Sequence, residues 1–117
     1  MTVRRVILKQ GESKILTLTV TDEAGALVNL TAAVLTLGVK QSAKDPAFIF
    51  QKADGVFDKT AAASGVVKVP LSATDTNQPE GEYIGELKAE WASSPVTIEK
   101  TVNFYIQIRQ AVIPAAP

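Results

Sequence analysis

Apolar and polar residues alternate with a period of two along most of the chain. Between Ser13 and Asp22, the apolar Leu16, Leu18 and Val20 alternate with threonines, a pattern typical of a strand with one buried face. Similar patterns predict six more strands, at Arg4–Lys9, Ala33–Lys40, Ala47–Lys52, Val66–Leu71, Glu82–Ala92 and Val96–Ile108. No stretch has a helical period. The pattern therefore predicts an all-β fold, an antiparallel β-sandwich of about seven strands in two sheets.

The last two predicted strands form the clearest hairpin. The inward positions of this pair are predicted to be Tyr83, Gly85, Leu87, Ala89 and Trp91 on the first strand and Val96, Ile98, Val102, Phe104, Ile106 and Ile108 on the second. With Ala92–Pro95 as the loop, including a Ser93-Ser94-Pro95 turn, Lys88 is expected opposite Glu99 and Trp91 opposite Val96. Lys100 breaks the alternation, so it either reaches the rim of the sheet or marks a bulge.

A sheet-changing corner is predicted between Leu71 and Tyr83. The strand Val66–Leu71 leads into a polar turn, where Ser72-x-x-Asp75 resembles a capping box and predicts one helical turn. The bend Pro79-Glu80-Gly81 then delivers Tyr83 to the next strand, as in the corner at which an immunoglobulin-like sandwich passes a strand between sheets. We name Leu71, Asp75, Gly81 and Tyr83 the structural corner. Tyr83 is expected to bury its ring and bond its hydroxyl to upstream backbone, the alternative being a plain core aromatic.

Length and charge limit the class of protein. The 117 residues predict one domain over 1–110, with 111–117 as a frayed tail. Twelve basic and twelve acidic residues cancel, which favours neither a nucleic-acid nor a membrane partner. The apolar residues near the N-terminus, Val3 and Val6–Leu8, are too few for a signal peptide of roughly 7–15 apolar residues or a membrane span of about 20.

The residue types offer little for catalysis. There is no cysteine and no histidine, so thiolate nucleophiles, Cys-based zinc sites and the commonest general base are excluded. Asp54 and Asp58 flank a glycine-containing loop that calcium could use, but too few oxygen donors lie nearby, and an ordinary solvated loop is the preferred interpretation. We therefore predict no enzyme, no cofactor and no metal site.

Three carboxylates share a face of one predicted strand, Glu82, Glu86 and Glu90. Residues four apart on a strand are roughly 13 Å apart, beyond the ~6.5–9.5 Å that separates the carboxyl groups of inverting glycosidases. These glutamates are predicted to form a solvated outer face.

The order of landmarks from Gly11 to Ile108 resembles a known family. The turn Asp22–Gly25, the connector Val28–Thr31 and the segment Leu71–Tyr83 resemble the immunoglobulin-like domains of tailed-phage and prophage baseplate or tail proteins, such as the N-terminal domain of baseplate upper proteins. The resemblance implies a non-enzymatic structural or adaptor component that docks onto other tail or baseplate proteins. It also implies location in the virion tail after assembly in the host cytoplasm. A homo-oligomer is compatible with this class.

An alternative is an accessory module that binds carbohydrate or a cell surface. Its candidate binding aromatics are Phe57, Trp91 and Tyr105. For Trp91 the competing interpretation is a side chain that caps the core.

Overall fold

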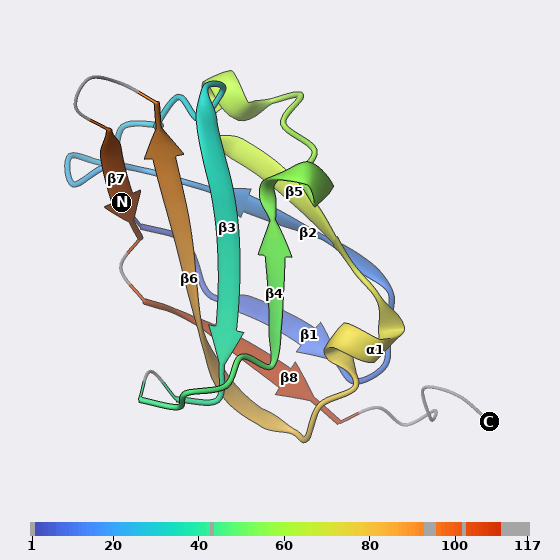
Figure 1. Cartoon of the computed structure of the whole chain (residues 1–117). Coiled ribbons are helices and arrows are strands. Elements are labelled where there is room, and N and C mark those ends of the chain that lie inside the picture. The colour runs from blue at the N-terminus through green and yellow to red at the C-terminus, as the bar shows by residue number, and fades with distance from the viewer. Residues whose placement is uncertain (1, 43, 93–95, 102, 111–117) are drawn as a thin grey trace.

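The chain folds as a β-sandwich of two sheets (Figure 1). The computed structural model describes residues 2–42, 44–92, 96–101 and 103–110. The strands are β1 (Val6–Lys9), β2 (Lys14–Thr19), β3 (Ala33–Lys40), β4 (Phe50–Ala53), β5 (Val66–Leu71), β6 (Gly81–Trp91), β7 (Thr97–Lys100) and β8 (Phe104–Arg109). Short 3₁₀ turns η1 (Asp54–Val56) and η2 (Ala62–Ser64) precede β5, and one helical turn, α1 (Ala73–Thr76), follows it. The predicted fold class is confirmed.

The larger sheet has the order β1-β8-β6-β3-β4, and β7 also pairs with β6. The smaller sheet pairs β2 with β5. Three expectations lie outside the described residues: the frayed tail 111–117, the Ser93-Ser94-Pro95 turn and the inward position of Val102.

The core lies between the inner faces of the two sheets. Along β3 the burial alternates, with Ala33, Leu35, Leu37 and Val39 buried and the intervening residues partly or fully exposed. The smaller sheet contributes Leu16, Leu18, Val67, Val69 and Leu71, and β6 and β8 contribute Tyr83, Leu87, Ala89, Phe104, Ile106 and Ile108. Burial of these side chains is the main favourable term in folding. The alternation read from the sequence thus assigns the inner faces of these strands correctly.

One pairing in the larger sheet is parallel. β1 runs alongside β8 with Val6 opposite Ile106 and Leu8 opposite Ile108. The expectation of a wholly antiparallel sandwich is therefore wrong at this position. Alternation within each strand is the same for both kinds of pairing, so it does not reveal direction.

The returning strand of the last hairpin is divided in two by a bulge. Ala89 of β6 lies opposite Glu99, whereas Gly85 lies opposite Phe104. Four steps along β6 therefore face five steps along the returning chain, which is the geometry of a bulge. The single predicted strand Val96–Ile108 becomes β7 and β8, and the bulge interpretation of the break at Lys100 is confirmed.

The predicted register of the hairpin is wrong by one residue. Lys88 lies opposite Lys100 instead of Glu99, and Trp91 lies opposite Thr97 instead of Val96. Because a shift of one residue exchanges the two faces of a strand, Ile98 lies on the outer face with its partner Glu90 and is 52% exposed. The expected inward position of Ile98 is corrected, and Val96 is also exposed.

The predicted strand Ala47–Lys52 begins later in the structure, so Phe48 and Phe50 differ in burial. β4 begins at Phe50, which is buried, while Phe48 lies in the connection before it and is exposed. A Cβ atom on Gly38 would lie 2.5 Å from the Phe48 ring. The glycine thus lets the ring lie directly against the outer face of β3.

Candidate functional site

The structural corner carries the chain from the smaller sheet at β5 to the larger sheet at β6. Ser72 caps α1: its Oγ accepts the Asp75 N–H at 3.1 Å, and the Asp75 carboxylate accepts the Ser72 N–H at 2.8 Å. The predicted capping box is present. Leu71 is buried just before the cap, and Gly81 opens β6.

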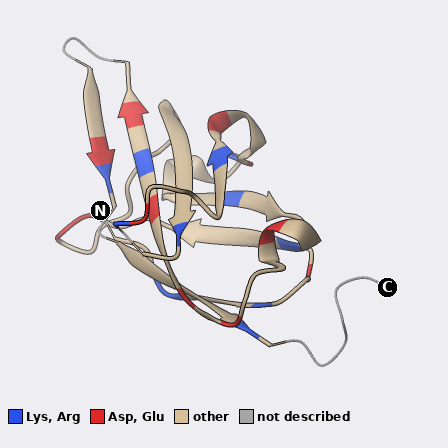
Figure 2. Ribbon diagram, turned by 60° about the horizontal axis from the view of Figure 1, so that its bottom comes forward, with Lys and Arg blue, Asp and Glu red and all other residues tan. Residues whose placement is uncertain are grey.

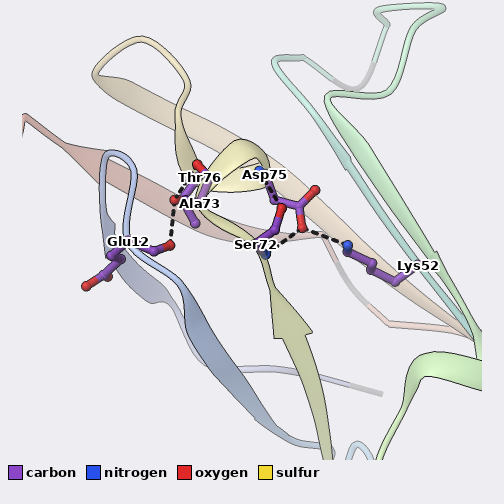
Figure 3. A network of polar contacts seen from close by, with 6 residues as sticks. All are labelled: Glu12, Lys52, Ser72, Ala73, Asp75 and Thr76. Carbon is purple, nitrogen blue, oxygen red and sulfur yellow. Dashed lines mark hydrogen bonds and ion pairs between the residues drawn. The ribbon is translucent and has the colours of Figure 1, made fainter. Parts of the chain in front are cut away.

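Polar contacts tie the corner to two other parts of the sandwich (Figure 3). Lys52 of β4 forms an ion pair with Asp75 at 2.7 Å, and the Thr76 hydroxyl donates to the Glu12 carbonyl oxygen at 2.7 Å. Burial alone would raise the pKa of Asp75, but hydrogen bonds from Lys52 and Ser72 outweigh it and hold the pKa below its usual value. Asp75 is therefore a structural carboxylate.

Tyr83 adopts the arrangement predicted for the corner. Its side chain is buried, and its hydroxyl donates to the Pro79 carbonyl oxygen at 2.5 Å. Burial raises the pKa of this phenol. The hydrogen bond links the start of β6 to the bend before it, so it fixes how the chain enters the larger sheet.

Replacement of Tyr83 by phenylalanine is expected to lower the free energy of unfolding by about 1 kcal/mol, because the Pro79 carbonyl loses its donor. Urea unfolding measures this change. Tyr105→Phe is the matched control, since that side chain is 48% exposed and its loss of a hydroxyl should change stability by less than about 0.5 kcal/mol. Equal effects of the two substitutions would show that the Tyr83 hydroxyl does not anchor the corner.

The two loop carboxylates considered for calcium, Asp54 and Asp58, instead accept hydrogen bonds from nearby backbone and side-chain groups. Asp54 accepts the Leu35 N–H at 2.9 Å and lies 3.2 Å from Lys59 Nζ. The Leu35 hydrogen bond chiefly holds the Asp54 pKa below its usual value. Hydrogen bonds from the Thr60 hydroxyl and N–H similarly lower the pKa of Asp58. Within the described residues, no group of three or more acidic side chains is placed to hold a metal ion.

The three glutamates of β6 lie on its outer face, as predicted. Glu82, Glu86 and Glu90 alternate with the buried Tyr83, Leu87 and Ala89. Glu82 forms an ion pair with Arg5 at 2.6 Å, and both side chains are about half exposed. Glu82 is therefore solvated, whereas Glu86 and Glu90 are partly buried and Glu86 lines a hollow on this face.

The three candidate binding aromatics do not form one platform. Phe57 is buried. Its neighbour Asp58 pairs with the exposed Lys68 on the outer side of β5, so the Phe57 side chain points to the opposite side, toward the core. Its proposed role as an exposed platform is thus wrong. Trp91 is half-buried against the core, whereas Tyr105 is exposed on the outer face of β8.

Two surface features emerge that the sequence did not reveal. The first is a hollow of about 260 Å³ on the outer face of the larger sheet, which we name the outer groove. It is lined by Thr36, Gly38, Lys40, Phe48, Gln51, Ile84, Glu86, Lys88, Lys100 and Asn103. Lys40 Nζ lies 4.8 Å from the centre of the Phe48 ring. Basic and acidic positions are interspersed along the adjoining β6–β7 hairpin (Figure 2).

The second feature is the β7 edge, the side of β7 that faces away from β6. The Thr101 N–H donates to the Leu87 carbonyl oxygen at 2.9 Å, which makes these residues a hydrogen-bonded pair. Such pairs alternate along an antiparallel ladder, so Thr97 and Glu99 face β6 while the N–H and C=O groups of Ile98 and Lys100 point outward. All four β7 side chains are exposed. The break in alternation at Lys100 was the available signal in the sequence.

The fold defines this chain as an immunoglobulin-like β-sandwich domain. It is similar to the crystal structure of a chicken TCR, with a TM-score of 0.56 and 10% sequence identity over 97% of this chain. The chain spans 58% of the length of that TCR chain. No protein-family model and no curated protein matches the sequence. Among the described residues, no helix has the length and apolar character needed to cross a membrane.

Proposed function

We propose that this domain is a non-enzymatic structural or adaptor component of a phage or prophage tail. It docks when a strand of a neighbouring tail or baseplate protein pairs with the β7 edge. The observation that carries this proposal is the row of outward backbone groups at Ile98 and Lys100, next to the exposed apolar side chains of Val96 and Ile98. Such an edge is a template for an added strand.

The borders of the smaller sheet are partly occupied by other backbone segments. The outer border of β5 is met by Asp58, which exchanges two backbone hydrogen bonds with Lys68 at 2.7 and 3.1 Å. Beyond the end of β2, Thr2 and Thr21 exchange two further backbone hydrogen bonds, at 2.8 and 3.2 Å. In the part of the chain that the structure describes, β7 pairs with β6 alone, as the edge strands β1 and β4 pair with β8 and β3 alone (Figure 1). All four β7 side chains are exposed, whereas β1 and β4 each have a buried residue, and this difference favours β7 as the docking strand.

The resemblance of the landmarks Asp22–Gly25, Val28–Thr31 and Leu71–Tyr83 to tail-protein domains supports a tail partner. An immunoglobulin-like sandwich is the fold which that resemblance implies. The absence of histidine and cysteine fits a role in assembly rather than catalysis.

Incorporation into tail particles tests this proposal. The tagged full chain is expressed in cells that produce the tail particles of its source, and purified particles are probed for it. Ile98→Pro removes one outward N–H, a change that edge strands tolerate. We expect the variant to fold with an unchanged melting temperature and to lose incorporation by about tenfold or more.

Ile98→Val is the matched control, because it keeps both the backbone donor and a β-branched apolar side chain. Its incorporation should equal that of the unsubstituted chain. A chain that never enters particles would overturn the tail assignment. Full incorporation of a folded Ile98→Pro variant would overturn docking through β7.

A further inference from the structure

One end of the outer groove holds two facing lysines, and Glu86 and Glu90 flank one of them on the same face of β6. Lys88 and Lys100 lie opposite each other on β6 and β7, in a non-hydrogen-bonded pair, where side chains are closest. Two like charges directly opposite each other on neighbouring strands destabilise the fold. Within the described residues, no carboxylate lies within ion-pair distance of Lys88, Lys100 or Lys40. A bound anion would relieve this repulsion.

The other end of the groove is apolar. The Phe48 ring lies against Gly38 and is 47% exposed, and Ile84 lies opposite Lys40 on the groove floor. The ring and the isoleucine offer contact to an apolar side chain, with Lys40 beside them.

The floor between the two ends restricts the kind of anion. Glu86 lies opposite Gly38 at the middle of the groove, where it repels a ligand with closely spaced negative charges, such as a nucleic-acid backbone or a polyphosphate. Gln51 and Asn103 also line the groove, and their amides can both donate to and accept from a peptide backbone. These groups favour single carboxylates separated by apolar residues.

We propose that the outer groove binds an extended acidic peptide segment of a partner protein. The groove crosses β4, β3, β6 and β7, about 14 Å at the usual spacing between strands, which an extended peptide spans with about four residues. A carboxylate of the peptide lies between Lys88 and Lys100, and an apolar side chain packs on Phe48 and Ile84. This site is on the sheet face, so it does not depend on docking through the β7 edge.

A peptide titration tests the proposal. The probe is a capped hexapeptide with the order leucine, serine, glutamate, serine, leucine, serine, so that its leucine and glutamate side chains share one face when it is extended. It is added to the full chain at low ionic strength while backbone amide resonances are recorded. We expect shifts centred on the strands that form the groove, and weaker binding as salt screens the charges. The double variant Lys88→Gln, Lys100→Gln should weaken binding by at least about tenfold. Its melting temperature should not fall, because the substitutions remove a repulsion.

Lys68→Gln is the matched control, since Lys68 is an exposed lysine on β5 of the smaller sheet; its binding should be unchanged. The proposal would be overturned if the same hexapeptide with glutamine in place of glutamate, or tripolyphosphate, bound at the same sites as tightly as the probe. It would also be overturned if the double variant bound the probe unchanged, or if the full chain bound no probe at millimolar concentration. Ile98→Pro should keep peptide binding, so failure at the groove and failure at the β7 edge are distinguishable.

Discussion

Gly65→Ala is expected to destabilise the native state by about 2–4 kcal/mol, from a left-handed backbone and a steric clash combined. Gly65 has φ +77°, and an added Cβ would lie 2.8 Å from the Val20 carbonyl oxygen and 3.0 Å from that of Val28. The backbone cannot easily move away, because the Gly65 carbonyl accepts the Val20 N–H at 2.8 Å and the Val20 carbonyl accepts the Val28 N–H at 3.1 Å. Three segments therefore meet at this glycine.

Urea unfolding measures the loss of unfolding free energy, provided that the m-value is the same for the variant and the unsubstituted chain. Gly25→Ala separates the two causes, because Gly25 has φ +84° but no atom within 4 Å of an added Cβ. The Gly25→Ala variant should lose only the free energy of holding an alanine in the left-handed backbone conformation, about 1–2 kcal/mol. Equal losses at the two positions would show that the contacts with Val20 and Val28 relax without cost.

The second large effect is expected at the bulge, where Thr101→Val should lower the free energy of unfolding by about 1–3 kcal/mol. Thr101 is buried, and its Oγ1 accepts the Leu87 N–H at 2.9 Å. The hydroxyl thus replaces the carbonyl that the bulge removes from the ladder. Valine has nearly the same shape but no acceptor, so the Leu87 N–H would remain buried without a partner.

Thr101→Ser keeps the acceptor and removes one methyl group, which should cost about 0.8 kcal/mol. Hydrogen exchange at the Leu87 amide gives a second measurement, with faster exchange expected in the valine variant alone. A serine variant less stable than the valine variant would show that packing of the methyl group, rather than the hydrogen bond, holds the bulge.

Local chemistry was sufficient for several parts of the molecule. The alternation within β2, β3 and β6 predicts their buried faces, because side chains on a strand point to opposite sides in turn. Ser72 and Asp75 predict the helical turn, since both partners of the capping box lie within four residues. The Tyr83 hydrogen bond is equally local and was predicted from the corner.

The candidate surfaces depend on contacts between distant segments, and the sequence did not predict them. The outer groove exists because Phe48 lies over Gly38 from the adjoining connection, while Lys100 reaches the same face after a change of register. The β7 edge follows from the same bulge. Neither the spacing nor the type of these residues indicates which strand they will meet.

The sequence by itself determined that this chain forms an immunoglobulin-like sandwich with a capped corner between sheets, because strand alternation and capping are properties of neighbouring residues. Only the tertiary structure decided the parallel pairing of β1, the burial of Phe57 and the opposition of Lys88 and Lys100. Each of these depends on register and direction between strands, which are set by packing across the whole sandwich.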